Sequence, residues 1–241
     1  MGSYLNPGTI EFQESLNSEI YIDKTGLIEK TNAVLRTKQK FVCISRPRRF
    51  GKSMAADMLA AYYERGEDAE ELFANFAIGK AESFQKHLNQ YDVLKINTQE
   101  FLSATQNIDE MLQMLKKYLI FDLKESYGQV RFRDEENLVQ VMKDIYTATK
   151  HAFVILIDEW DCLFREYKED KEAQRKYLDF LRAWLKDKAY VALAYMTGIL
   201  PIKKYGSHSA LNMFTEYSMT DPGNMAEYFG FTEQEVSDLC K

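Results

Sequence analysis

The sequence contains few cysteines, prolines and glycines, and it has no long apolar run. Its 241 residues include three cysteines, four prolines and 11 glycines. Three widely spaced cysteines make neither a disulfide framework nor a Cys-x-x-Cys metal or redox motif, which favours a reducing, cytoplasmic setting. No run approaches the ~20 apolar residues of a membrane span, and the N-terminus lacks the basic-then-apolar layout of a signal peptide. We therefore expect a soluble globular chain that does not enter a membrane.

The charge of the chain is negative overall but uneven along the sequence. A net charge of −6 argues against nucleic-acid binding by the chain as a whole. Between positions 36 and 52, however, there are seven basic residues and no acidic one: Arg36, Lys38, Lys40, Arg46, Arg48, Arg49 and Lys52. This tract could be a solvated basic face or a phosphate-binding surface. We favour the phosphate-binding surface, because the tract coincides with a Gly-Lys-Ser turn.

Short apolar runs alternate with helical patterns along the chain. Strand-length runs cover residues 41–44, 93–96, 153–157 and 191–196, with a weaker fifth run at 217–219. Continuous apolarity is typical of parallel strands with helices on both sheet faces. The alternation predicts one doubly wound α/β domain with a mainly parallel five-stranded sheet. Ligands of such sheets bind beyond the carboxyl ends of the strands, so the residues that follow each strand are the ones to examine for chemistry.

The first strand leads into the turn Arg46-Pro-Arg-Arg-Phe-Gly-Lys-Ser53, and a helical pattern follows. This is the setting of a P-loop (Walker A motif), where backbone N–H groups and a helix N-terminus bind phosphate oxygens. Lys52 would then reach the β- and γ-phosphates and assist catalysis, and the Ser53 hydroxyl would ligate Mg²⁺. The expected phosphate-binding residues are Arg46, Pro47, Arg48, Arg49, Phe50, Gly51, Lys52, Ser53 and Met54. Arg46 replaces the usual first glycine, so its side chain must point out of the loop.

The third strand ends in two carboxylates, Asp158 and Glu159, which is the Walker B arrangement. In that arrangement Asp158 would hold Mg²⁺ next to Ser53, and Glu159 would orient and activate the attacking water. The alternative is an acidic strand end that caps the next helix. We favour the metal site because both motifs occur in order, and the roughly 105 residues between them leave room for an inserted strand.

Other polar residues near strand ends have less specific interpretations. Asp161 could orient Glu159 or metal-bound waters, or it could cap the next helix. Thr197 ends the fourth strand, and it could contact the γ-phosphate or the attacking water, or simply begin a turn. Lys203 and Lys204 could reach phosphate, but a solvated surface is the safer interpretation for both.

Four segments together resemble the bacterial AAA-ATPase-like family of P-loop ATPases, which is close to the archaeal and STAND-type ATPases. The segments are Tyr21-Ile-Asp-Lys-Thr25, Ser45-Arg-Pro-Arg-Arg-Phe-Gly-Lys-Ser53, Ile157-Asp-Glu-Trp-Asp161 and the run from Thr197 to Gly206. The resemblance covers about residues 21–231. It is specific, because the family's own P-loop carries Arg-Pro-Arg-Arg-Phe in place of the first glycine.

The resemblance implies a P-loop NTPase sheet with strand order 5-1-4-3-2 and a site for ATP and Mg²⁺. It places Asp23, Lys24 and Thr25 near the adenine side of that site, just before a helix, and a plain helix N-cap role for Asp23 is compatible with that placement. Family members typically continue into a lid and a PD-(D/E)xK nuclease-like domain. We therefore expect an ATPase core over residues 1–231 and the start of the lid or C-terminal region over 232–241, where Thr232 and Glu235 form a capping box.

The function predicted from these features is a Mg²⁺-dependent ATPase core that acts as a switch or motor for an attached effector domain. Arg48 and Arg49 could contact phosphate in their own subunit, or the nucleotide of a neighbouring subunit through self-association. One alternative is a nucleotide-sensing module with negligible turnover. Another is a nucleic-acid-binding module that uses the basic tract or an attached domain.

Overall fold

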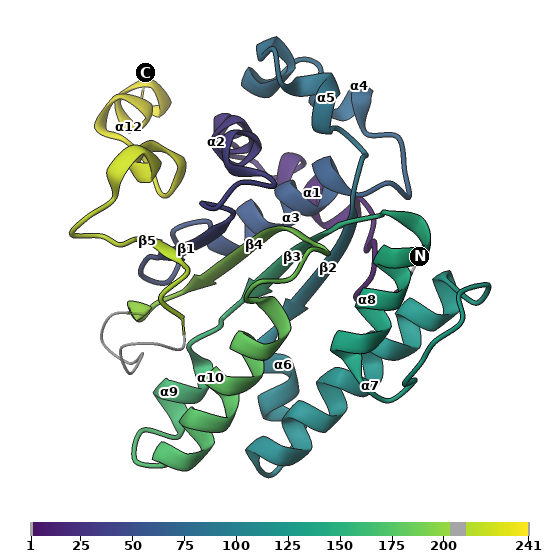
Figure 1. Ribbon diagram of the computed structural model, residues 1–241. Coiled ribbons are helices and arrows are strands. Elements are labelled where there is room, and N and C mark those ends of the chain that lie inside the picture. Colours follow the sequence, from purple (N-terminus) through teal and green to yellow (C-terminus); the bar gives the residue numbers. More distant parts are fainter. Residues whose placement is uncertain (1, 203–210, 241) are drawn as a thin grey trace.

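The computed structural model describes residues 2–202 and 211–240, and the predicted Lys203 and Lys204 lie outside this part. Its core is a five-stranded sheet in which every pairing is parallel. The strands are β1 (Phe41–Ser45), β2 (Asp92–Asn97), β3 (Phe153–Asp158), β4 (Val191–Gly198) and β5 (Thr215–Tyr217). Their order is β2-β3-β4-β1-β5, which reads 5-1-4-3-2 from the other edge, as expected from the sequence (Figure 1). The fifth strand lies slightly earlier than the apolar run at 217–219 suggested.

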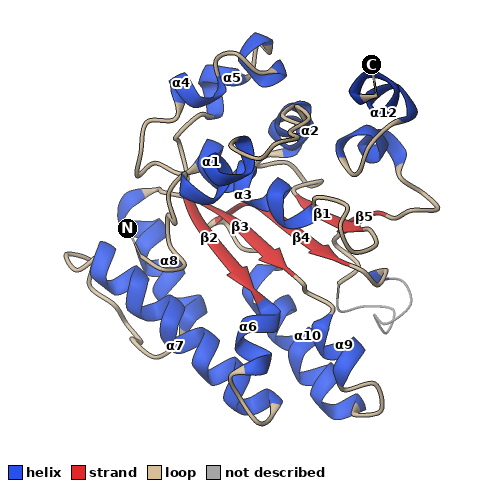
Figure 2. Ribbon diagram, turned by 180° about the vertical axis from the view of Figure 1, so that it is seen from behind, coloured by secondary structure: helices blue, strands red, loops and turns tan. Residues whose placement is uncertain are grey.

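Helices cover both faces of the sheet, as Figure 2 shows. On one face lie α1 (Ile10–Leu16), α2 (Gly26–Val34), α3 (Lys52–Tyr63), α4 (Glu70–Phe73), η1 (Ala77–Lys80) and α5 (Phe84–His87). On the other lie α6 (Thr98–Ser103), α7 (Ile108–Ser126), α8 (Leu138–Thr149), α9 (Cys162–Glu166) and α10 (Lys171–Leu185). The chain continues after β5 through η2 (Gly223–Tyr228) to α12 (Glu233–Leu239), which lies on the side of α2 (Figure 1).

Two apolar clusters fill the space between the sheet and the two helix layers. Successive strand side chains point to opposite faces, so β1 contributes Phe41 and Cys43 to one cluster and Val42 and Ile44 to the other. This double burial explains why the strand sequence is continuously apolar. Cys43 and Cys162 are buried, while Cys240 is exposed.

Side-chain hydrogen bonds cap the N-termini of α7 and α12. Asn107 accepts a hydrogen bond from the Glu110 backbone at the start of α7. Thr232 and Glu235 form the predicted reciprocal capping box of α12. Each cap satisfies backbone N–H groups that have no partner within the helix. In the described part of the chain, no helix has the length and apolarity needed to cross a bilayer.

Candidate functional site

The turn from β1 into α3 depends on a left-handed backbone at Gly51. Gly51 is the N-cap of α3 with φ 74°, and Arg49 also has a positive φ of 68°. A Cβ on Gly51 would meet nothing within 4 Å, so glycine is required here by conformation and not by space. The turn directs the N-terminus of α3, with its unpaired N–H groups and partial positive charge, toward the carboxyl end of the sheet.

Three segments converge on the carboxylate of Asp158 at the end of β3. Ser53, in the first turn of α3, donates a hydrogen bond of 2.5 Å from Oγ to Asp158 Oδ2. Thr197, near the end of β4, donates from Oγ1 to Asp158 Oδ1. The same Oδ1 accepts the backbone N–H of Glu159 at 2.9 Å. The structure therefore brings together Ser53, Asp158, Glu159 and Thr197, all of which the sequence indicated as candidate site residues.

Lys52 is buried beside these carboxylates. Its Nζ donates to the carbonyl oxygen of Pro47 at 2.9 Å, so the side chain folds back over its own loop. Burial lowers the pKa of the Lys52 ammonium, and the carboxylates of Glu159 and Asp158 oppose that shift. Lys52 thus lies within electrostatic reach of Asp158, at the end of β3, and of Glu159, directly after it.

Glu159 has a constrained position at the start of the turn after β3. Its φ of 53° lies in the left-handed region, which is unusual for a residue with a side chain. Its carboxylate accepts a hydrogen bond from Nη2 of Arg165, on α9. A backbone in this region is retained where surrounding contacts over-determine it, and such positions cluster at functional sites.

Asp161 is fully buried, and it joins the turn after β3 to the turn after β4. Its Oδ2 accepts the backbone N–H groups of Ile199 at 3.1 Å and Leu200 at 2.7 Å. A Cβ on Gly198 would lie 2.7 Å from Asp161 Oδ1, so the glycine permits this close approach. Asp161 is the N-cap residue of α9, but its side chain makes no cap hydrogen bond there. Of the two interpretations of Asp161, the structure disfavours the capping one.

Arg46 points out of the phosphate loop, as its sequence position requires. Its Nη1 donates to the carbonyl oxygens of Ser45 at 3.0 Å and Tyr217 at 2.7 Å, and its guanidinium lies 5.4 Å from the Phe229 ring centroid. Only 2% of the residue is exposed. These contacts join β1 to β5 and to the segment before α12. The side chain of Arg46 is therefore a packing element, and only its backbone remains in the predicted phosphate-binding set.

The rest of the predicted phosphate loop is exposed or half-buried. Pro47, Arg48, Arg49, Gly51, Ser53 and Met54 are exposed, and Phe50 is half-buried. Within residues 2–202 and 211–240, neither Arg48 nor Arg49 has a hydrogen bond or ion pair. Both arginine side chains are thus available to an anionic ligand.

An apolar cavity of about 170 Å³ adjoins this loop. It is lined by Phe12, Ile20, Tyr21, Ile22, Lys24, Arg49, Phe50, Gly51, Met54, Ala55, Met58, Tyr228, Gly230 and Phe231. The segment before α12 covers it, since Gly230 N–H donates to Phe50 O at 3.2 Å. Lys24 ties α12 to the cavity wall by bonding Glu235 Oε1 and Glu227 O, each at 2.6 Å.

Asp23 does not line the cavity. Its carboxylate accepts the N–H and the hydroxyl of Thr25 at 2.8 and 2.6 Å, and the N–H of Ala77 at 2.7 Å. Thr25, and not Asp23, is the N-cap residue of α2. The Asp23 carboxylate nevertheless accepts the Thr25 N–H at the start of α2, as a capping side chain does, and it also ties this helix start to η1. Of the predicted adenine-side residues, Lys24 is the one that lines the cavity.

Comparison with known proteins identifies the family. A family model described as "Predicted AAA-ATPase" matches residues 8–207. The chain belongs to this AAA-ATPase-like family. An "uncharacterized protein in vnfD 5'region" of Azotobacter chroococcum mcd 1 is 25% identical over 225 residues, which cover 90% of this chain and 40% of that protein. The solved structure of C. elegans PCH-2 matches at 14% identity with a TM-score of 0.38, over 89% of this chain and 47% of that one. The chain spans less than half the length of each.

The oxygen atoms at the candidate site suit a hard divalent cation. Ser53 Oγ and Asp158 Oδ2 are both oxygen atoms and lie 2.5 Å apart. Mg²⁺ usually binds through one or two protein oxygens and takes its other ligands from phosphates and water, and this pair of oxygens suits it.

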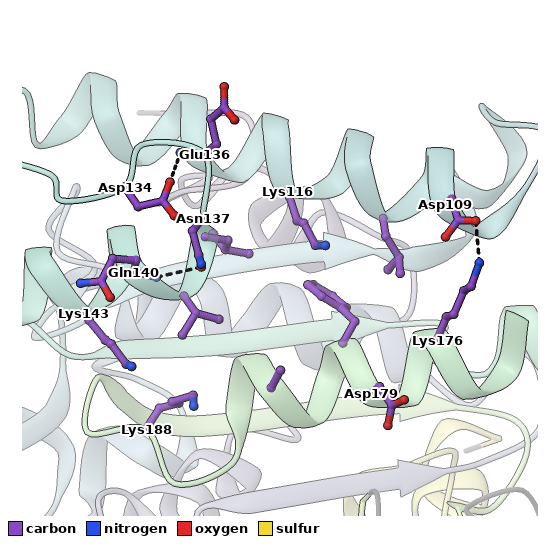
Figure 3. Close-up of a pocket in the computed structure, with 15 residues that line it drawn as sticks. Asp109, Lys116, Asp134, Glu136, Asn137, Gln140, Lys143, Lys176, Asp179 and Lys188 are labelled. Atoms are coloured by element: carbon purple, nitrogen blue, oxygen red, sulfur yellow. Dashed lines mark hydrogen bonds and ion pairs between the residues drawn. The ribbon is translucent and has the colours of Figure 1, made fainter. Parts of the chain in front are cut away.

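A larger hollow, of about 880 Å³, lies on the opposite helical layer between α7, α8 and α10 (Figure 3). Its lining includes four lysines and four carboxylates, and Lys176 is paired with Asp109 at 2.7 Å. It contains no residue of the β1–α3 turn or of the strand ends. Because its charges balance and none of the phosphate-loop or strand-end residues line it, this hollow is not the candidate site despite its size.

Two parts of the site were missed in the sequence. Arg165 contacts Glu159, and the segment around Tyr228, Gly230 and Phe231 covers the apolar cavity. Arg165 follows Glu159 closely in a helical pattern, so its charge was a readable signal. Nothing local in residues 228–231 indicates that they pack against a loop nearly 180 positions earlier.

Proposed function

We propose that this chain binds ATP with Mg²⁺ at the β1–α3 turn and hydrolyses it, serving as the ATPase core for an attached effector domain. The observation that carries the proposal is the contact of Ser53 with Asp158, which joins the phosphate loop to the end of β3. Membership of the AAA-ATPase-like family supports nucleotide binding.

The phosphates would bind the N–H groups of the Arg46–Ser53 loop and the N-terminus of α3. Lys52 would exchange its contact with Pro47 O for the phosphate oxygens. Ser53 and Asp158 would hold Mg²⁺, which when bound neutralises charge on the phosphate oxygens. The base would enter the apolar cavity next to Met54 and Tyr228, which is about 170 Å³ in size.

In the hydrolytic step, a water molecule attacks the γ-phosphorus and the bond to the β-phosphate oxygen breaks. ADP and inorganic phosphate are the products. Glu159 accepts the proton that the water loses, because it comes directly after the end of β3 and its carboxylate lies within electrostatic reach of Lys52. Thr197 holds Asp158 in place from β4.

The test combines calorimetry with phosphate release. ATP should bind with Mg²⁺ present, and Lys52→Ala should abolish that binding. Glu159→Gln should keep the affinity and slow phosphate release by about 10²–10⁴-fold, the usual contribution of a general base. Lys38→Ala, an exposed lysine of the same basic tract, is the matched control and should change neither.

Three outcomes would contradict the proposal in different ways. Binding without phosphate release over hours would identify a nucleotide sensor. Phosphate release unaffected by Glu159→Gln would remove the role of Glu159. DNA binding that falls steeply with salt and is insensitive to ATP would identify a nucleic-acid module that uses the basic tract.

A further inference from the structure

Arg165 contacts both acidic residues of the turn after β3. Its Nη2 donates to Glu159 Oε2, and its Nε lies 3.6 Å from Asp161 Oδ2. The side chains of Arg165 and Glu159 are 19% and 23% exposed, so solvent screens their interaction only in part. Arginine forms directional hydrogen bonds through a planar fork, which makes it suited to orient a carboxylate and not merely to neutralise it.

The position of Arg165 is itself determined by the end of β4. Asp161, its second contact, is fully buried and accepts the N–H groups of Ile199 and Leu200. The tight packing of Gly198 against Asp161 leaves little freedom for that carboxylate. A continuous chain of contacts therefore runs from the backbone after β4, through Asp161 and Arg165, to Glu159.

The Glu159 carboxylate keeps one oxygen free of this chain of contacts. Within the described residues, its side-chain contacts involve Oε2 alone. Oε1 is then the atom that can accept a hydrogen bond from water. The left-handed backbone of Glu159 adds a constraint on where the side chain begins, so backbone and Arg165 together define its direction.

We propose that Arg165 is the positioning residue that fixes the Glu159 carboxylate for water activation. The inference rests on the proposed function, because it concerns the same hydrolytic step. Arg165 contacts neither nucleotide nor water in this scheme, and it acts only through Glu159. Its loss should therefore slow the chemical step and leave nucleotide affinity unchanged.

The first experiment measures turnover and affinity in the full chain. Arg165→Ala should lower kcat about tenfold or more, while KM and the calorimetric Kd for ATP stay within about twofold. Arg165→Lys should recover part of the loss, since it keeps the charge but not the fork. Arg165→Ala combined with Glu159→Ala should be no slower than Glu159→Ala alone. Arg175→Ala on α10, where Arg175 pairs with Asp179 at 3.6 Å, is the matched control.

The second experiment needs no nucleotide. Urea unfolding of the wild type, Arg165→Ala, Glu159→Ala and the double variant forms a double-mutant cycle. The midpoint shift of the double variant should be smaller than the sum of the two single shifts. Additive midpoint shifts would show that Arg165 and Glu159 are not energetically coupled, which would overturn the inference.

The remaining outcomes separate the inference from the proposed function. If the wild type turns over ATP and Arg165→Ala does so at least as fast, the inference is overturned and the proposed function is not. A parallel loss of kcat and ATP affinity would also overturn it, because Arg165 would then be a general structural residue. Absence of wild-type turnover would overturn hydrolysis itself, and the inference with it.

Discussion

Ser53 Oγ donates a hydrogen bond of 2.5 Å to Asp158 Oδ2, across 105 positions of sequence. One residue lies in the first turn of α3 and the other ends β3, and β4 separates β3 from β1 in the sheet. The contact is possible because parallel strands end at the same edge, so residues that follow different strands meet there. Two oxygen atoms are thereby presented together beside the buried Lys52.

Loss of the Ser53 hydroxyl should remove the dependence of ATP binding on Mg²⁺. We expect Ser53→Ala to weaken binding about tenfold or more with Mg²⁺ present, because one of the two protein oxygens is lost. Binding in the presence of a chelator should match the wild type. Calorimetry with and without Mg²⁺ measures both, and Ser126→Ala, at an exposed serine ending α7, is the control. Equal losses in both conditions would argue against a metal-binding role.

Thr197→Val should slow turnover more than it weakens binding. The substitution keeps the shape of Thr197 but removes the hydroxyl that donates to Asp158 Oδ1, so the carboxylate loses one of its two fixed contacts on that oxygen. We expect kcat to fall about tenfold, which corresponds to about 1.4 kcal/mol. Thr147→Val on α8 is the matched control. Unchanged kcat would support the simpler interpretation of Thr197 as a turn residue.

Arg46→Met should destabilise the fold and leave the phosphate site largely intact. The two carbonyl oxygens of Ser45 and Tyr217 would lose a charged donor. Each hydrogen bond to a charged group contributes about 1.5–3 kcal/mol, so the loss of both should lower the free energy of unfolding by about 3–6 kcal/mol. Urea denaturation measures this. Loss of ATP affinity with unchanged stability would show instead that Arg46 contacts the nucleotide.

The ion pair between Lys24 and Glu235 should make the free energy of unfolding depend on pH below neutrality. Burial raises the pKa of the Glu235 carboxyl, but hydrogen bonds from Lys24 and Thr232 outweigh it, so the pKa lies below its usual value of 4.5. A lowered folded-state pKa means that the contact stabilises the protein above the unfolded pKa and that this contribution is lost as pH falls through the folded pKa.

Glu235→Gln keeps a side chain that can complete the capping box and removes the charge. We expect the variant to be less stable than the wild type at pH 7, by no more than about 1 kcal/mol, and to converge with it below about pH 4.5. Glu233→Gln, in the same first turn of α12, is the control. A difference that persists in acid would exclude an ionic cause.

Arg49 should act on nucleotide bound to its own subunit. It lines the apolar cavity together with Phe50 and Gly51, whereas Arg48 does not. We expect Arg49→Ala to weaken ATP binding more than Arg48→Ala does. Mixing Arg49→Ala with Lys52→Ala protein should not restore phosphate release, because neither subunit has a complete site. Restored activity would place Arg49 in a neighbouring subunit's site and demonstrate self-association.

Much of the scaffold could be predicted because its signals are local. Apolar runs identified β1 to β4, and Thr232 with Glu235 identified the start of α12, since a strand or a cap depends on neighbouring residues. The fifth strand was displaced in the prediction. It is a short edge strand with no buried residue, so its sequence carries little apolar signal.

Side-chain directions were harder to predict, because they depend on packing between distant segments. Asp23 was expected near the base but bonds Thr25 and Ala77. In the sequence, a place near the base and a helix N-cap were compatible roles for Asp23, because a carboxylate before a helix can serve in both. The contact with Ala77 depends on where η1 packs, which no local pattern encodes.

By itself, the sequence determined the order of the strands along the chain, the glycine-dependent turn before Lys52 and the two carboxylates that follow β3. These depend on backbone conformation and hydrophobic periodicity within short windows. Only the tertiary structure decided that Ser53 meets Asp158, that Arg46 packs under Phe229 and that Arg165 holds Glu159. Such contacts depend on how the strands and helices pack together, which sets the direction of each side chain and which partner it meets.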